Sequence, residues 1–185
     1  MLVKSYAAAV QGISATVITI EVNCTKGIQF FLVGLPDVAV RESHERIISA
    51  LQVSGYKFPR NRIVINMAPA DIRKEGSSYD LPLAIGILAA AEELDASRLG
   101  HYMMMGELSL DGSLKPVKGI LPIAIKAREE GFKGFIVPKQ NAREAAVVNN
   151  LEVYGVENIK EVIEFMGGKR ELEQTVVDTR KEFYA

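Results

Sequence analysis

The sequence has few residues that bind metals or form cross-links, with one cysteine, two histidines and no tryptophan among its 185 residues. A single cysteine excludes an intramolecular disulfide framework, and Cys and His are the usual ligands of zinc. No apolar run reaches the roughly 18 residues that a membrane-spanning helix needs. Residues 1–6 lack the charged start and apolar block of a secretory signal peptide. We therefore expect a cytoplasmic protein with no metal site and no membrane contact.

An excess of positive charge is absent as well, since 22 Lys and Arg stand against 23 Asp and Glu for a net charge of -1. Proteins that coat nucleic acid are basic overall, so any contact with nucleic acid here would come from a local basic surface. Hydrophobic residues make up 48% of the chain and charged residues 24%, which is typical of a folded globular protein. The length suits one domain of roughly 100–200 residues.

The common motifs of nucleotide binding and hydrolysis are missing. Neither G-x-x-x-x-G-K-[ST] nor G-x-G-x-x-G after a strand occurs, and there is no G-x-S-x-G. Gly167-Gly168-Lys169-Arg170 differs from a phosphate loop in its spacing and lacks the hydroxyl. His44 falls on the apolar face of a predicted helix, where we expect it to pack, and His101 has no carboxylate neighbour in the sequence.

Alternating β-branched residues predict strands in the first third of the chain. The period of two over residues 14–23 is typical of a half-buried strand. Lys26-Gly27 predicts a turn into a strand at 28–33, and thus an antiparallel hairpin; another strand is expected at 1–10. We expect helices at 38–54 (capped by Asp37), 81–94, 120–130, 139–149 and 159–165, strands at 63–67, 134–137 and 151–154, and a hairpin of 103–110 with 114–117 around Asp111-Gly112.

This order of elements predicts an α+β fold, a mixed α/β sandwich. Gly167-Gly168 ends the pattern, and the residues that follow are charged, with weak apolar periodicity. We therefore expect one domain at residues 1–166, followed by a linker at residues 167–185.

A polar loop at residues 71–80 lies between a predicted buried strand and a predicted buried helix, where functional loops are common. Ser77 or Ser78 could be a nucleophile at the helix N-terminus, where backbone N–H groups can hold an oxyanion. Alternatively, the loop only begins the helix. A cap at Ser77 would place Pro82 at the fifth helical position, at a cost of about 3 kcal/mol, so we predict Asp80 as the N-cap.

Three runs in this order resemble the proteolytic domain of Lon. They are Glu75-Gly76-Ser77-Ser78-Tyr79-Asp80, Gly106-Glu107-Leu108-Ser109-Leu110-Asp111-Gly112, and Gly134-Phe135-Ile136-Val137-Pro138-Lys139-Gln140-Asn141. The corresponding family motifs are a D-G-P-S-A-G nucleophile loop, a G-E-[IV]-[ST]-L-x-G hairpin and an [IV]-P-x-x-N strand end. The resemblance covers residues 63–141.

A closer resemblance, over nearly the whole chain, is to the N-terminal domain of magnesium-chelatase-like AAA+ proteins of the YifB/ComM type. The runs that carry it are Ala7-Ala8-Ala9-Val10-Gln11-Gly12, Val22-Asn23, Gly34-Leu35-Pro36-Asp37, Ile65-Asn66-Met67-Ala68-Pro69-Ala70-Asp71-Ile72-Arg73-Lys74-Glu75-Gly76 and Tyr79-Asp80-Leu81-Pro82-Leu83-Ala84. This resemblance implies a Lon-protease-like, ChlI-type domain with the fold of ribosomal protein S5 domain 2.

The comparison with Lon implies a lost peptidase. The Lon nucleophile falls on Ser78, and the lysine base of Lon falls on Leu121, which cannot deprotonate a serine. Lys118 lies three residues earlier and is expected to precede the helix. The small residues that follow the Lon serine are replaced by Tyr79 and Asp80. We expect a pseudo-protease with no catalytic residue and no cofactor of its own.

In the AAA+ family this domain precedes an ATPase module that binds ATP and Mg²⁺. The resemblance implies a hexameric motor for DNA branch migration in natural transformation, in which this chain is an accessory domain that contacts its own AAA+ module, neighbouring subunits or DNA. We expect residues 167–185 to lead into that module, which is absent here. The candidate residues for contacts with DNA or a partner are Lys57, Arg60, Arg62, Arg73, Lys74, Lys115 and Lys118.

Two other functions stay open at this point. One is a serine hydrolase that uses Ser78 with an unorthodox base. The other is a chelatase-type metal chaperone, which only the family name supports, since Asp71, Glu75 and Asp80 are scattered along one loop.

Overall fold

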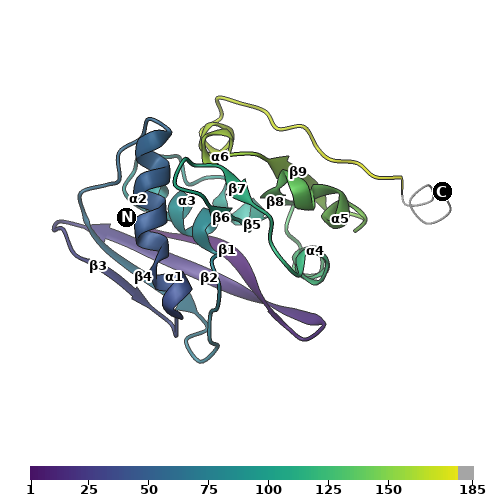
Figure 1. The fold of residues 1–185 in the computed structure, drawn as a ribbon, viewed down its shortest axis with the longest axis horizontal. Coiled ribbons are helices and arrows are strands. Elements are labelled where there is room, and N and C mark those ends of the chain that lie inside the picture. Colours follow the sequence, from purple (N-terminus) through teal and green to yellow (C-terminus); the bar gives the residue numbers. More distant parts are fainter. Residues whose placement is uncertain (179–185) are drawn as a thin grey trace.

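A seven-stranded sheet in the order β3-β4-β2-β1-β5-β8-β9 organises the fold, and β6 and β7 form a separate two-stranded ribbon. The computed structural model describes residues 1–178 (Figure 1). The strands are β1 (Leu2–Gln11), β2 (Ser14–Thr25), β3 (Phe30–Val33), β4 (Arg62–Ala68), β5 (Tyr102–Met104), β6 (Glu107–Leu108), β7 (Leu114–Lys115), β8 (Gly134–Pro138) and β9 (Glu152–Val156). The predicted α+β class, with Lon-like relationships, is confirmed.

The pairing of the first strands differs from the predicted hairpin. β2 pairs antiparallel with β1 and with β4, while β3 pairs parallel with β4. The expected hairpin between residues 14–23 and 28–33 is therefore wrong. The seven-residue strand β4, whose Ile63, Ile65 and Met67 are buried, pairs along its whole length with β2 and leaves β3 at the edge.

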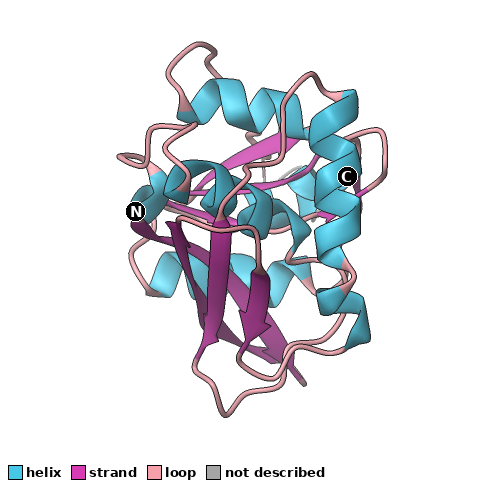
Figure 2. Ribbon diagram, turned by 90° about the vertical axis from the view of Figure 1, so that its left-hand side faces the viewer, coloured by secondary structure: helices cyan, strands magenta, loops and turns pink. Residues whose placement is uncertain are grey.

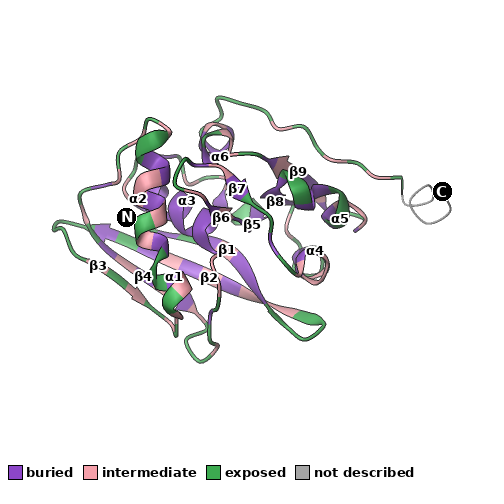
Figure 3. Cartoon of the chain, viewed as in Figure 1, coloured by how far each residue is buried: buried purple, intermediate pink, exposed green. Residues whose placement is uncertain are grey.

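Helices cover both faces of the sheet (Figure 2). On one face, the Ser5 hydroxyl donates to Pro82 O on α3 (Asp80–Ala90) at 2.9 Å. On the other face, Tyr6 contacts Phe132, the ring centroids lying 5.3 Å apart, just after α4 (Ile120–Glu129). Adjacent strand residues point to opposite faces, so α3 and α4 enclose β1 between them. Every residue of α3 is buried (Figure 3), as predicted for a core helix.

The remaining helices are α1 (Val38–Arg41), α2 (Ser43–Val53), η1 (Leu99–His101), η2 (Lys139–Asn141), α5 (Ala142–Ala146) and α6 (Ile159–Met166). The predicted helix at 38–54 is divided at Glu42, and the one at 139–149 is a 3-10 turn followed by the shorter α5. Asp37 caps α1 as predicted, because its carboxylate accepts from Val40 N at 2.8 Å.

The predicted cap of α3 is wrong. Asp80 is the first residue of the helix, Tyr79 stands at the cap position, and Pro82 becomes the third helical residue. A proline is tolerated in the first turn because the N–H it lacks would have no intrahelical acceptor there. The Asp80 carboxylate is consequently free to bind groups from other elements.

In the second half of the chain, the hairpin about Asp111-Gly112 is present but short, with only β6 and β7 paired. The strand expected at 103–110 is divided, because β5 joins the main sheet and pairs parallel with β1 and β8. His44 packs, as expected: its ring stacks on Phe30 with centroids 3.9 Å apart and an interplanar angle of 4°. Within residues 1–178, no helix is long and apolar enough to cross a bilayer.

The stretch after α6 lies along the outer edge of the sheet (Figure 1). Thr175 N donates to Val153 O of β9 at 2.8 Å, and Tyr154 pairs with Gln174. We call residues 169–178 the C-terminal strap. The proposed linker at 167–185 includes this strap, and its last seven residues lie outside the described part of the chain.

Candidate functional site

The polar loop of residues 71–79 is held against the segment that joins β5 to β6. Gly106 N donates to Ser78 O at 2.8 Å, and Leu81 N donates to Gly106 O at 3.1 Å. The Asp37 carboxylate, which caps α1, also accepts from Gly76 N at 3.0 Å. These bonds place both serines at the N-terminus of α3, where the comparison with Lon predicts the nucleophile.

Ser78 stands at the position that the resemblance to Lon predicts for the nucleophile. The residue is half-buried, and its hydroxyl has no hydrogen-bond partner among residues 1–178. Leu121, the predicted position of the Lon lysine, is a half-buried apolar residue on α4. Burial raises the pKa of Tyr79 to about 12, with Asp37 and Glu75 adding to the shift. Tyr79 therefore keeps its proton at neutral pH and cannot act as the base.

Ser77 is the serine that binds a carboxylate. Its hydroxyl donates to Oε1 of Glu107 on β6, and Oε2 of Glu107 lies 3.9 Å from Nζ of Lys115 on β7. The ribbon of β6 and β7 thus brings a carboxylate and a lysine side chain next to the loop. Glu107 belongs to the hairpin run that resembles Lon, but its pairing with Ser77 spans 30 residues and leaves no spacing signal in the sequence.

Asp80 anchors the start of α3. Its buried carboxylate accepts from Nε of Arg46 at 2.7 Å, from Nη2 of Arg46 at 2.9 Å and from Leu108 N at 3.0 Å. Burial raises the pKa of the Asp80 carboxyl, and the bonds from Arg46 and Leu108 oppose that shift. Arg46 lies on α2, 34 residues away. The sequence analysis did not find this pair, because no local pattern marks it.

Lys74 does not belong to the exposed basic residues. It is fully buried, and its Nζ donates to Gly34 O at 2.7 Å and to Pro69 O. Burial lowers the pKa of the Lys74 ammonium. The proposal that Lys74 contacts DNA or a partner is therefore corrected. The bond to Gly34 O joins the loop after β4 to the loop after β3, and the bond to Pro69 O lies within the loop after β4.

The other candidate basic residues are exposed but do not gather into one surface. The segment of Lys57, Arg60 and Arg62 leads into β4, while Arg73 follows the opposite end of that strand. Seven residues of strand separate them by about 20 Å. Arg62 lies over the Phe31 ring at 5.2 Å, and Arg73 pairs with Glu75 at 3.1 Å. Lys115 and Lys118 lie beside the ribbon.

Within residues 1–178, no three or more His, Cys, Asp or Glu side chains form a group suited to a metal ion. Asp71, Glu75 and Asp80 are not brought together, since Asp80 points to Arg46 and Glu75 pairs with Arg73.

Comparison with known proteins relates the chain to one protein family and to three individual proteins. The family described as subunit ChlI of Mg-chelatase matches residues 20–141, more than half of the chain. Competence protein ComM of Haemophilus influenzae is 43% identical over 168 residues, and YifB of Escherichia coli is 42% identical over 167; each match covers 90% of this chain and 33% of that protein. Lon protease 2 of Bacillus subtilis is 29% identical over 123 residues, covering 66% of this chain and 22% of the protease. The chain spans about one third of the length of ComM and YifB.

Proposed function

Because the chain belongs to the family of the ChlI subunit of Mg-chelatase, we propose that it is a non-catalytic accessory domain of a cytoplasmic AAA+ ATPase that processes DNA. The observation that carries the proposal is the nucleophile position itself. The Ser78 hydroxyl has no hydrogen-bond partner among the described residues, and we infer that Leu121 stands where Lon has its base. A serine needs an adjacent base or a lowered pKa to act as a nucleophile.

The surroundings of the serine favour a structural role for the loop. Asp37, Asp80 and Lys74 each bind groups of other segments and so hold the loop in place. Their combined effect is a loop fixed to α1, α2 and β6. We infer that the Lon-type fold is retained here as a scaffold.

The name of the relative ComM suggests the larger process, DNA uptake in competence. We propose that the chain assists assembly of a hexameric motor for branch migration, with ATP and Mg²⁺ bound by a AAA+ module. It would touch that module, a neighbouring subunit or DNA through exposed basic residues, of which Lys57, Arg60 and Arg62 form one segment.

The test of the DNA contact uses the intact protein. Replacing Lys57 and Arg60 by Gln should weaken binding to duplex DNA and reduce the salt slope by about one per lost phosphate contact. The matched control is Lys4→Gln together with Lys160→Gln, which removes the same charge from exposed positions on β1 and α6. If both double variants bind DNA with the same affinity and the same salt slope, DNA binding by this segment is contradicted. The accessory role in assembly would not be affected by that result, and hexamer formation by the intact protein tests it separately.

A serine hydrolase remains the second candidate, and the bond from Ser77 to Glu107 is the observation that favours it, because a carboxylate can accept a serine proton. The test is labelling by a serine-directed fluorophosphonate and cleavage of unfolded casein. We expect neither in the wild type. Labelling that disappears in Ser77→Ala or in Ser78→Ala would overturn the non-catalytic assignment and identify the nucleophile.

A further inference from the structure

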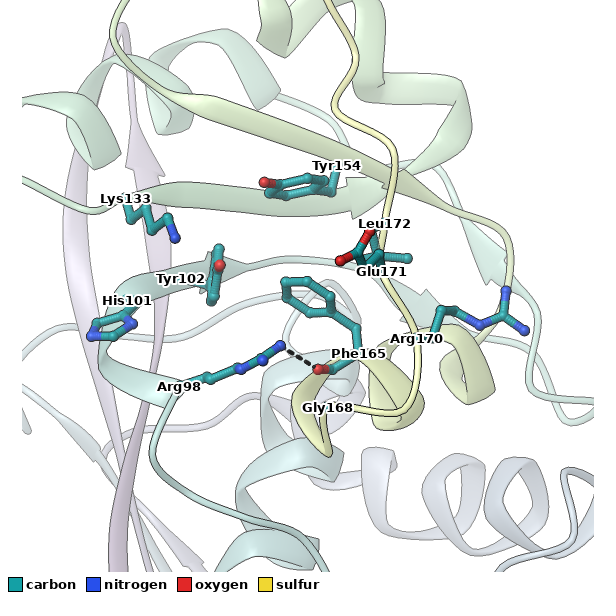
Figure 4. Close-up of a pocket in the computed structure, with 10 residues that line it drawn as sticks. All are labelled: Arg98, His101, Tyr102, Lys133, Tyr154, Phe165, Gly168, Arg170, Glu171 and Leu172. Atoms are coloured by element: carbon teal, nitrogen blue, oxygen red, sulfur yellow. Dashed lines mark hydrogen bonds between the residues drawn. The ribbon is translucent and has the colours of Figure 1, made fainter.

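A cavity of about 490 Å³ lies at the amino ends of β5 and β8, far along the sheet from β3 and β4 (Figure 4). Its walls come from η1, from the residue before β8, from the end of α6 and from the beginning of the C-terminal strap. Small-molecule sites in proteins have volumes of roughly 300–1,000 Å³. The cavity therefore has the size of a site for a small ligand.

Three aromatic rings form the floor of the cavity. Tyr102 and Phe165 meet edge to face, with centroids 5.3 Å apart, and Tyr154 lies 5.7 Å from Phe165 and 6.1 Å from Tyr102. Each ring is at least nine-tenths buried, and the Tyr154 hydroxyl is held by Glu152 at 2.6 Å. The floor is thus apolar and fixed in position before any ligand arrives.

One side of the cavity is cationic. The Arg98 guanidinium lies over the Phe165 ring at 5.3 Å and donates to Phe165 O at 2.8 Å, so its position is set. Lys133 and His101 flank it (Figure 4). Neither Arg98 nor Lys133 forms a salt bridge with another residue of the described chain. The two cations give this wall a local preference for an anion, which the nearby Asp95 charge and the Glu171 carboxylate across the cavity reduce.

The opposite wall, made by the strap, is acidic. Figure 4 shows the Glu171 carboxylate turned toward the aromatic floor, whereas the Arg170 side chain points away from it. Arg170 binds Glu164 instead, at 3.3 Å. The cavity is therefore polarised, with hydrogen-bond donors on the side of Arg98 and Lys133 and an acceptor on the side of Glu171.

We propose that this cavity binds a nucleotide unit. The phosphate lies against Arg98 and Lys133, where guanidinium and ammonium groups make charge-assisted bonds to phosphate oxygens. The sugar and base lie on the aromatic floor, and an exocyclic amine of the base donates to Glu171. The unit is either a free mononucleotide or one residue of a single strand, since both present the same phosphate and base.

The site goes beyond the proposed accessory role, since it uses none of the basic residues named for that role. Binding here is therefore measurable whether or not the loop before β4 contacts DNA. The chain has no phosphate loop, so a nucleotide that binds the isolated 185-residue chain has no known motif to account for it.

The experiment measures binding of AMP, adenosine, inorganic phosphate and a twelve-residue oligo(dA) to the full 185-residue chain by calorimetry. We expect AMP to bind more tightly than adenosine or phosphate alone. Lys133→Gln and His101→Gln should each weaken AMP binding, with Lys133→Gln costing about 10- to 150-fold, the range of a charged hydrogen bond. Both side chains are exposed, so the fold should be retained, as circular dichroism will check. Lys26→Gln, at a distant turn, is the matched control and should bind as the wild type does.

The same titrations distinguish a free mononucleotide from a residue of a single strand. If oligo(dA) binds more tightly than AMP, and Lys133→Gln weakens that binding, the site is assigned to a single strand. If AMP binds more tightly than oligo(dA), the site is assigned to a free nucleotide. The proposal is overturned if AMP and oligo(dA) both fail to bind at about 5 mM. It is also overturned if Lys133→Gln and Lys26→Gln bind with the same affinity.

Discussion

Arg46 on α2 holds Asp80 at the first residue of α3 through two parallel hydrogen bonds, from Nε at 2.7 Å and from Nη2 at 2.9 Å. The Asp80 side chain is 1% exposed and that of Arg46 is 20% exposed. The pair therefore joins two helices at a position closed to water, directly after the degenerate nucleophile loop.

Removing Arg46 should be costly, because it leaves the Asp80 carboxylate buried without its partner. We expect Arg46→Met to lower the free energy of unfolding by about 3 kcal/mol, measured by urea denaturation at pH 7. The deficit should shrink at acid pH, where protonation removes the buried charge of Asp80. The control is Arg73→Met, whose ion pair with Glu75 is exposed and should contribute at most about 1 kcal/mol. Equal losses in both variants would contradict this assignment.

Replacing Ser77 by Ala should lower the free energy of unfolding more than replacing Ser78 by Ala does. Ser77→Ala removes the donor to Glu107 and should cost about 1 kcal/mol of unfolding free energy. Ser78→Ala removes a hydroxyl without a partner in the described chain and should stay within about 0.5 kcal/mol of the wild type. Urea denaturation of both variants tests the pair. A larger loss for Ser78→Ala would mean that the hydroxyl of Ser78 makes a stabilising contact.

Stability should depend on pH through His44. Burial lowers the pKa of His44 from its ordinary value of 6.5, so the unfolded chain binds the proton more readily than the folded chain. The contribution of His44 to stability is therefore complete above about pH 6.5 and is lost as the pH falls below that value. We expect His44→Phe, which keeps a ring against Phe30, to lose less stability than the wild type between pH 7 and pH 5. The measurement is the midpoint of thermal unfolding of both proteins across this pH range. If the two midpoints fall equally with pH, the role of His44 is contradicted.

The C-terminal strap should detach when its bond to β9 is removed. Thr175→Pro deletes the N–H that donates to Val153 O at 2.8 Å. We expect trypsin to cleave after Lys169 or Arg170 about fivefold faster, as the loss of roughly 1 kcal/mol implies. Thr175→Ala keeps the N–H and serves as the control. Cleavage at one rate in the two variants would show that Leu172 and the rest of the strap hold it without this bond.

Elements with an unbroken apolar pattern were predictable from the sequence, and pairings over long distances were not. The buried run of β8 and the Asp111-Gly112 turn carry local signals, and both are present. The Lys26-Gly27 turn carries a similar signal, yet β4 pairs with β2 in place of β3. The turn signal is local, whereas the strand that pairs with β2 begins more than 30 residues after β2 ends.

The position of the candidate site came from sequence motifs. These motifs assign the nucleophile position to Ser78 and the position of its base to Leu121, and both assignments stay predictions. They did not show that Lys74, next to exposed Arg73, turns inward to two carbonyls, because adjacent residues of an irregular loop have no periodicity to separate inside from outside. The helical pattern around Arg46 likewise shows only that this position is not apolar. It does not show that the side chain binds Asp80.

The strap also bears on how the protein behaves at high concentration. An uncovered edge strand offers unpaired N–H and C=O groups to any other chain and is a site of aggregation. The strap occupies part of that edge on β9 through Gln174 and Thr175, while at the other end of the sheet β3 is only four residues long. A shortened chain that lacked the strap would thus be expected to self-associate through β9, and its poor solubility would say nothing about the stability of the core.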